Sequence, residues 1–294
     1  MRDFGINFGD FEPADAVDWI DTHPTQHNAE RYLIELADVI ADAGLDVVEV
    51  DGWQQRARGS GGYDGTAPWS VMWHHTASNT SPENDVGYIC FGCPDAPVSN
   101  LYLARDGVVW VCAAGATNTN GTGGPFMTSR GVVPVDRMNE YAVSIEAAND
   151  GLGQPWPHVQ IDNYFRLSLA LTDWLGLEPG DVCTHAAWTT RKIDPARADA
   201  IEGPWQPRST NTSGTWNLDD IIDELWLRSD QQFPEEPDMT DEQAQQLSQT
   251  LNAANATNRN IWGGENNDPP YGLSIFGRLD AIERKLGIDP WAGS

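Results

Sequence analysis

The 294-residue sequence has few basic residues: 17 lysines and arginines stand against 44 aspartates and glutamates, for a formal net charge of −27. Lysine occurs at only two positions, Lys192 and Lys285. Nucleic acids and anionic membrane surfaces are polyanions, so a chain this acidic is poorly suited to bind either of them. We therefore expect no nucleic-acid partner, and any lysine within a candidate site becomes informative.

Long apolar runs are also missing, since no stretch of about 18 apolar residues is present to span a bilayer. We therefore expect no membrane insertion. The start of the chain, Met1–Gly5, shows no apolar segment followed by a small-residue cleavage site, so no secretory signal is expected. The protein is thus expected to be made in a cytoplasm.

Cysteine is scarce, with four residues at Cys90, Cys93, Cys112 and Cys183. Cys90 and Cys93 form a C-x-x-C pair, but no second pair follows at zinc-ribbon spacing, which disfavours a structural metal there. The other two lie in apolar runs, as buried small residues do. Without a secretory signal, all four are expected to be free thiols.

Hydrophobic residues make up 40% of the chain, which indicates a globular protein. Strand-like and helix-like segments alternate, and residues 79–87 between them read as a polar loop. This alternation predicts an α/β fold with a mixed central β-sheet flanked by helices. The predicted helices are 29–43, 160–175 and 218–227, and the predicted strands are 46–50, 69–73, 99–104, 107–112, 142–147 and 181–184.

Two prolines and three acidic residues within 233–238 are typical of a linker. Beyond it, two short apolar series predict a small helical C-terminal tail. We therefore divide the chain into a main domain over 1–229 with an N-terminal extension, a linker at 230–239 and a helical module at 240–294. The helices of this module could pack on each other, on the main domain or on a second copy of the chain.

Residues 183–195 place His185, Lys192 and Asp194 within one short segment. A catalytic zinc site uses three protein ligands and keeps one position open, and His185 and Asp194 can supply two of them. The third can come from His74 or His75, which follow the predicted strand 69–73. Adjacent side chains on a strand point to opposite faces, so only one of these two histidines can bind the metal.

Hydrolysis of an amide at such a zinc also needs a base and a positive group that faces the developing oxyanion. Glu146, at the end of the predicted strand 142–147, can act as the base. Lys192, two residues before a ligand, can face the oxyanion. The set predicts a zinc hydrolase. An ordinary surface His–Asp pair and a solvated strand-end carboxylate are the alternatives.

Four segments occur in a fixed order, and together they resemble one known family. The set is similar to type 2 N-acetylmuramoyl-L-alanine amidases, which are relatives of peptidoglycan recognition proteins, and especially to endolysins of phages that infect actinobacteria. The resemblance covers roughly residues 30–228. The segments are Val-Met-Trp-His-His-Thr-Ala from Val71, Tyr-Leu-Ala-Arg-Asp-Gly-Val-Val from Tyr102, Val-Ser-Ile-Glu-Ala-Ala-Asn from Val143 and His-Ala-Ala-Trp-Thr-Thr-Arg-Lys-Ile-Asp-Pro from His185.

The resemblance implies a Zn²⁺ enzyme that acts on bacterial peptidoglycan, at the amide between N-acetylmuramic acid and L-alanine. It places the zinc ligands at His74, His185 and Asp194, and the catalytic residues at Glu146 and Lys192. As a phage endolysin for host lysis, the protein would be made in the host cytoplasm and act on the cell wall after release through a separate pore. The helical module would then bind the wall or form a homo-oligomer.

Two departures from the family pattern concern loops. Lys192 lies seven residues after His185, one fewer than in many relatives, and residues 118–121 read Asn-Thr-Asn-Gly where many relatives have Asn-His-Ala-Gly. The second departure predicts an altered substrate contact with the chemistry retained. Asn149 and Trp188 are predicted to contact the substrate.

Two other functions fit part of the pattern. One is a non-catalytic peptidoglycan-binding module, although non-enzymatic relatives usually lose a zinc ligand and all three are present here. The other is a zinc peptidase or deacetylase that acts on another part of the cell wall.

Overall fold

The computed structural model describes residues 31–208 and 212–232. The chain divides into two units, Met1–Ile222 and Asp223–Ser294. The N-terminal extension up to residue 30 and the predicted helical module 240–294 lie outside the described residues. The same holds for the predicted linker 230–239 after its first three residues. The roles expected for these segments stay predictions.

A six-stranded sheet forms the centre of the first unit, in the order β1-β4-β3-β7-β2-β8. β4 pairs antiparallel with β3, while the other four neighbouring pairs are parallel. The predicted α/β class with a mixed sheet is therefore confirmed. The strands are β1 (Val47–Glu49), β2 (Ser70–His75), β3 (Leu101–Leu103), β4 (Val109–Val111), β7 (Ala142–Ala147) and β8 (Val182–Thr184).

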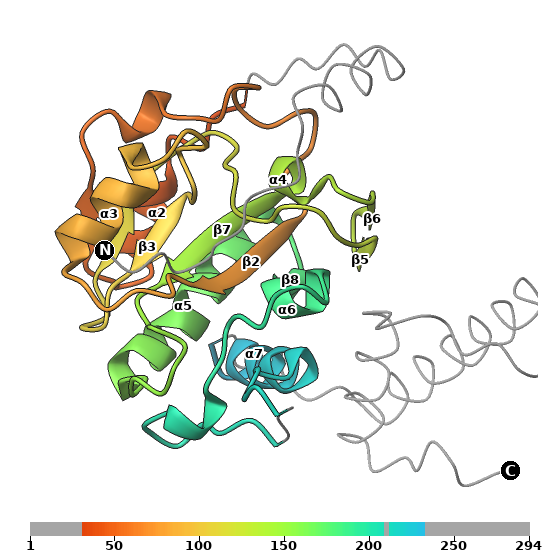
Figure 1. The fold of residues 1–294 in the computed structure, drawn as a ribbon. Helices are drawn as coiled ribbons and strands as arrows, with labels where there is room; N and C mark the ends of the chain where they lie inside the picture. Colours follow the sequence, from red (N-terminus) through yellow and green to blue (C-terminus); the bar gives the residue numbers. More distant parts are fainter. Residues whose placement is uncertain (1–30, 209–211, 233–294) are drawn as a thin grey trace, which may run out of the picture. The chain divides into compact units, whose positions relative to one another are not determined.

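One face of the sheet is covered by α5 (His158–Leu175), with α2 (Leu36–Asp42) packed beside it (Figure 1). Trp73 of β2 stacks on Tyr164 of α5 with ring centroids 3.7 Å apart, and its indole N–H donates to Ser168 Oγ at 2.7 Å. A buried aromatic pair of this kind stabilises the helix–sheet contact through both apolar area and ring geometry. This face is therefore filled by core packing.

The opposite face carries α3 (Pro82–Phe91), α4 (Met138–Tyr141), α6 (His185–Trp188) and the hairpin of β5 (Phe126–Thr128) with β6 (Gly131–Val133). Met72 of β2 belongs to a buried cluster there with Met138 and Trp188. A second cluster joins α3 to Tyr102 of β3. This face is less evenly covered, because several short elements replace the long helix of the other side.

The helix α3 corrects the prediction of a polar loop at 79–87. Pro82 stands at the first helical position, where its fixed φ suits the helix and its missing N–H costs nothing. Val86, Ile89 and Cys90 recur at helical spacing and are buried against the sheet. Only these three positions are apolar on the buried side of α3. The formation of this helix therefore depends more on tertiary packing than on the local sequence pattern.

The register of three neighbouring strands decides where the ends of the strands meet. In the parallel pair of β2 and β7, His74 lies opposite Glu146, and in the pair of β2 and β8, Trp73 lies opposite Thr184. β8 therefore ends one residue before His185. The carboxyl ends of parallel strands share one edge of a sheet. His74, Glu146 and His185, from distant parts of the chain, therefore meet at this edge.

The remaining elements are the short 3₁₀ turns η1 (Trp53–Gln55), η2 (Pro179–Asp181) and η3 (Ala198–Ala200), and the helix α7 (Leu218–Gln232). Among the described residues, no helix combines the length and the apolar character needed to cross a bilayer.

Candidate metal centre and active site

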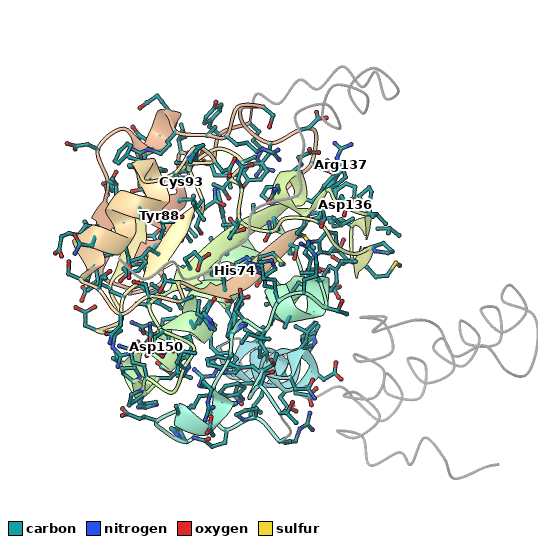
Figure 2. All side chains as sticks on the ribbon, in the orientation of Figure 1. His74, Tyr88, Cys93, Asp136, Arg137 and Asp150 are labelled. Atoms are coloured by element: carbon teal, nitrogen blue, oxygen red, sulfur yellow. The ribbon has the colours of Figure 1, made fainter. Side chains whose placement is uncertain are left out.

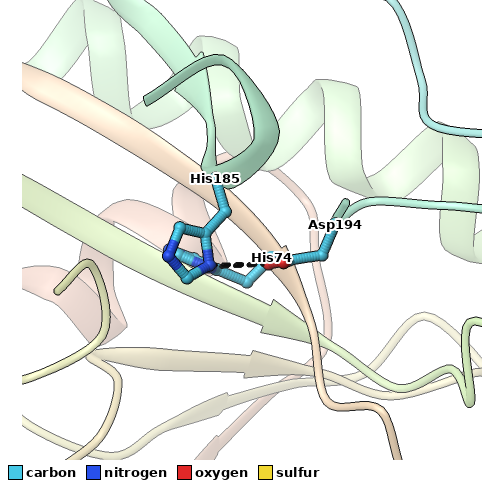
Figure 3. A group of neighbouring side chains, drawn as sticks. All are labelled: His74, His185 and Asp194. Carbon is cyan, nitrogen blue, oxygen red and sulfur yellow. Dashed lines mark hydrogen bonds and ion pairs between the residues drawn. The ribbon is translucent and has the colours of Figure 1, made fainter. Parts of the chain in front are cut away.

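Three buried side chains converge at the carboxyl edge of the sheet: His74, His185 and Asp194 (Figure 3). His74 is the second-last residue of β2 and is labelled in Figure 2. His185 begins α6, whose start is capped by the Thr184 side chain accepting from the Ala187 N–H at 3.1 Å. Asp194 lies on the loop that follows, and its carbonyl accepts from the Ala186 N–H at 3.0 Å.

The three polar atoms that face one another are His74 Nδ1, His185 Nδ1 and Asp194 Oδ2. The two nitrogens are 3.0 Å apart, and the carboxylate oxygen lies 3.1 Å from His74 Nδ1 and 2.9 Å from His185 Nδ1. A tetrahedral zinc with ligands at about 2.0–2.1 Å holds its ligand atoms roughly 3.3 Å apart. The donor set therefore fits a zinc ion after shifts of a few tenths of an ångström.

The charge state of Asp194 also suits a metal ligand. Burial acts to raise its pKa, but His185 and His74, which both contact the carboxylate, outweigh burial and hold the pKa well below the usual range. The carboxylate is therefore ionised at neutral pH. An ionised carboxylate beside two imidazole nitrogens is a donor set typical of hydrolytic zinc sites.

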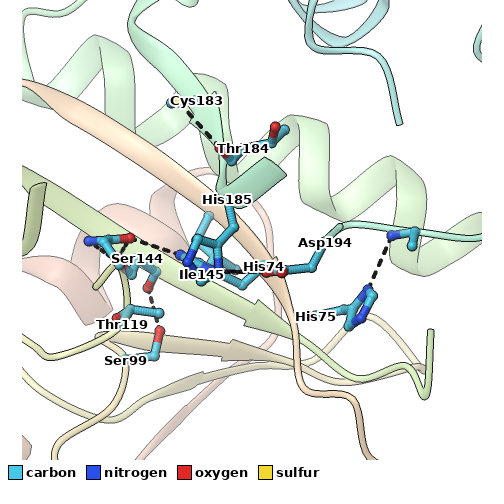
Figure 4. Close-up of polar contacts among 12 residues, drawn as sticks. His74, His75, Ser99, Thr119, Ser144, Ile145, Cys183, Thr184, His185 and Asp194 are labelled. Atoms are coloured by element: carbon cyan, nitrogen blue, oxygen red, sulfur yellow. Dashed lines mark hydrogen bonds and ion pairs between the residues drawn. The ribbon is translucent and has the colours of Figure 1, made fainter. Parts of the chain in front are cut away.

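His75 lies on the opposite face of β2 from His74, as the alternation of side chains along a strand predicts (Figure 4). Its Nδ1 accepts from the Ala196 N–H at 3.1 Å, and burial lowers its pKa despite the opposing charge of Asp194. A buried neutral imidazole in this position ties β2 to the loop after Asp194. The structure thus brings only the first of the two adjacent histidines into the cluster.

Glu146 lies beside His74, because the two are register partners in β7 and β2 and share a face of the sheet. Its Oε2 atom is buried and has no hydrogen-bond partner among the described residues. Burial raises the pKa of Glu146 to about 7, while the charge of His74 acts in the opposite direction. A carboxyl group with a pKa near neutrality can both take up and release a proton, which is what a catalytic base requires.

Lys192 is half-buried on the loop between α6 and Asp194. Its backbone N–H donates to the Thr189 carbonyl at 3.3 Å, which helps to shape this loop. The lysine charge lowers the pKa of Glu146, whereas that of Asp194 raises it. The ammonium group therefore acts electrostatically on the candidate base, and the structure brings the five predicted metal and catalytic residues into one region.

The two predicted substrate contacts are both buried. Trp188 is 3% exposed, and its ring lies so close to the backbone at Gly123 and Gly124 that a Cβ at Gly124 would overlap the indole. Asn149 shapes the loop after β7, where its Oδ1 accepts from the Gly151 N–H at 2.9 Å and its Nδ2 donates to the Gln154 carbonyl at 3.1 Å. A substrate contact by either residue stays a prediction.

One polar neighbour of the cluster was not identified from the sequence. Asn120 is buried, and its Oδ1 lies 2.9 Å from Nε2 of His74, the ring nitrogen that faces away from His185 and Asp194. The only signal near it was the departure from the family pattern at residues 118–121. That departure marks the segment as unusual but says nothing about a histidine 46 residues earlier in the chain.

Comparison with known proteins agrees with this chemistry. The profile of the N-acetylmuramoyl-L-alanine amidase family matches residues 64–197, which contain all five of the converging metal and catalytic candidates. Comparison with curated proteins gave no match.

The similar solved structures include amidases and a recognition protein. The endolysin amidase LysCS from Clostridium intestinale URNW shares 16% identity over 53% of this chain and 89% of that chain, with a TM-score of 0.37. The amidase AmiD from E. coli, in complex with a muramyl-peptide substrate, shares 18% over 51% and 60%, with a TM-score of 0.36. Drosophila PGRP-LB shares 14% over 49% and 84%, with a TM-score of 0.35.

The family match covers the strand that bears His74, the strand that bears Glu146 and the loop that bears Lys192 and Asp194. It therefore confirms the resemblance to amidases that the four sequence segments indicate. Residues 64–197 of the chain are thus similar to the family of N-acetylmuramoyl-L-alanine amidases.

Proposed function

We propose that this amidase is a zinc-dependent peptidoglycan hydrolase that cleaves the amide bond between N-acetylmuramic acid and L-alanine. The observation that carries the zinc dependence is the convergence of His74 Nδ1, His185 Nδ1 and Asp194 Oδ2 within 3.1 Å of one another. Two imidazoles and an ionised carboxylate, all buried, present lone pairs to a common point.

The three ligands would hold the zinc ion, which when bound polarises a carbonyl group and lowers the pKa of water. Glu146 takes a proton from the water that attacks the scissile carbonyl and returns it to the amine of L-alanine as the carbon–nitrogen bond breaks. Lys192 faces the oxygen on which negative charge develops. The glycan is left with a lactyl carboxylate, and the stem peptide leaves with a free amino terminus.

We further propose that the enzyme serves as a phage endolysin for host lysis. The support for this role is the ordered set of four segments that resembles endolysins of phages infecting actinobacteria. The phage role rests on that resemblance, whereas the amidase chemistry rests on the site.

The proposed reaction predicts a defined product. Digestion of purified actinobacterial peptidoglycan should release stem peptides that begin with a free L-alanine amino group, together with glycan chains that keep intact lactyl groups. Mass spectrometry of the soluble fraction identifies both. Fragments cut within the stem peptide would instead show a peptidase, loss of acetyl groups would show a deacetylase, and wall binding without any release would show a binding module.

The metal centre predicts a contrast between two adjacent histidines. His74→Ala removes one of three ligands, so bound zinc and amide cleavage should both be lost. His75→Ala is the matched control, because His75 is also buried but lies on the other face of β2. It should retain about one zinc per chain. Elemental analysis of both purified variants measures this, and full zinc content in His74→Ala would contradict the assignment.

The candidate base predicts that Glu146→Gln keeps its zinc but loses on the order of 10²–10⁴-fold in kcat, as removal of a general base commonly does. A near-normal rate would place the base elsewhere.

The pKa of Glu146 also predicts the stability of the metal-free protein. Because the folded state raises the Glu146 pKa to about 7, the stability associated with its neutral form is lost as pH rises towards and through about 7. At pH values above 7, the metal-free Glu146→Gln protein should therefore have a higher Tm than the metal-free unmodified protein.

Lys192 should contribute more to the transition state than to substrate binding, because negative charge on the attacked oxygen appears only during the reaction. Lys192→Ala should therefore lower kcat by roughly 10²–10³-fold with a smaller change in KM and with zinc retained. Lys192→Arg should restore only part of the rate, since a planar guanidinium is a poor substitute for a compact ammonium. Kinetics on a soluble muramyl-peptide test this, and an unchanged kcat in Lys192→Ala would exclude the lysine from catalysis.

A further inference from the structure

The carboxamide of Asn120 contacts Nε2 of the His74 ring. The Asn120 side chain is 0% exposed, and its Oδ1 lies 2.9 Å from His74 Nε2. The other ring nitrogen, Nδ1, faces His185 and Asp194. The His74 imidazole is therefore held between the proposed metal position on one side and a buried amide oxygen on the other.

The chemistry of a metal-bound histidine decides what this second contact does. A neutral imidazole that offers the Nδ1 lone pair to a metal carries its proton on Nε2, and that proton needs an acceptor when it is buried. Asn120 Oδ1 is an acceptor at hydrogen-bond distance. Without it, the buried N–H would be left unsatisfied, and the ring could turn or adopt the tautomer that blocks Nδ1.

Asn120 is itself held in place before any metal binds. Its backbone N–H donates to Asn139 Oδ1 at 2.7 Å, and its Nδ2 donates to Ser144 Oγ at 3.3 Å (Figure 4 shows Ser144 beside His74). The Ser144 hydroxyl also lies 3.5 Å from Asn120 Oδ1, so it contacts both polar atoms of the amide and holds the side chain beside the histidine. The preceding residue is fixed as well, because the Thr119 hydroxyl donates to the Val98 carbonyl and lies 3.0 Å from the Thr117 hydroxyl.

We propose that Asn120 is a positioning residue of the metal site, which holds His74 in the tautomer and ring orientation that present Nδ1 to zinc. This inference rests on the proposed zinc centre. It also gives a role to the segment 118–121, where the sequence departs from the Asn-His-Ala-Gly pattern and places Asn120 at the alanine.

The first measurement is zinc affinity, determined by competition with a chromophoric chelator and independent of any cleavage assay. Loss of an outer partner of a metal-bound histidine typically weakens metal binding about 10–100-fold, and we expect this loss in Asn120→Ala. Asn120→Asp should recover most of the affinity, because a carboxylate oxygen can accept the same proton.

The matched control is Ser99→Ala. Ser99 is as buried as Asn120, and its hydroxyl hydrogen-bonds the carbonyls of Ser144 and Leu101, but it makes no contact with His74 among the described residues. Ser99→Ala should lower the Tm of the metal-free protein while zinc affinity stays within about threefold of the unmodified value. An equal loss of affinity in both alanine variants would reduce Asn120 to a residue of general stability and overturn the proposal.

A spectroscopic readout tests the tautomer directly. In the zinc-loaded protein, the Nε2 proton of His74 should appear in ¹H–¹⁵N spectra as a signal that exchanges slowly with water, and it should exchange fast in Asn120→Ala. Unchanged zinc affinity together with an unchanged Nε2 signal in Asn120→Ala would overturn this proposal alone. Absence of zinc binding in the unmodified protein would instead overturn the metal centre, and this proposal with it.

Discussion

The parallel pairing of β2 with β7 and β8 is the constraint on which the rest of the site depends. It places His74 opposite Glu146 and ends β8 one residue before His185. Because side chains alternate along a strand, a shift of one residue in either pairing would turn the candidate base or a candidate metal ligand to the face covered by α5. The stacking of Trp73 on Tyr164 on that face opposes such a shift, since a large aromatic pair would have to leave the core.

Polar contacts reinforce the same register from within the sheet. The Tyr164 hydroxyl accepts from the His74 N–H at 2.9 Å and lies 3.1 Å from the Ile145 carbonyl, so one side chain of α5 bridges β2 and β7. Asn100, which directly precedes β3, also bonds to β7, because its Oδ1 accepts from the Ser144 N–H at 3.0 Å. The strands that carry the candidate ligand His74 and the candidate base Glu146 are thus tied together by a buried side chain as well as by the sheet itself.

The two carboxyl groups of the site differ in how well the protein stabilises their charged forms. Asp194 is stabilised as an anion by two histidines, whereas Glu146 has a raised pKa and one buried oxygen without a partner among the described residues. Fully satisfying Glu146 with hydrogen bonds would stabilise the fold but would also make the carboxylate a weaker base. The arrangement is consistent with a residue retained for proton transfer, since perturbed carboxyl groups gather at active sites for this reason.

The sequence by itself determined the fold class, most of the strands and long helices, and the candidate set of His74, His185, Asp194, Glu146 and Lys192. Strand alternation and motif order are local signals, and they survive without knowledge of the packing. Tertiary structure decided the rest. It turned residues 82–91 into a helix, because three apolar side chains find a surface to cover. It also brought Asn120 to His74 and buried Trp188 against Gly124, because these contacts join a loop to β2 and to α6, which no spacing in the chain relates. Contacts between segments that lie far apart in the chain depend on the strand register, which forms only when the whole sheet is assembled.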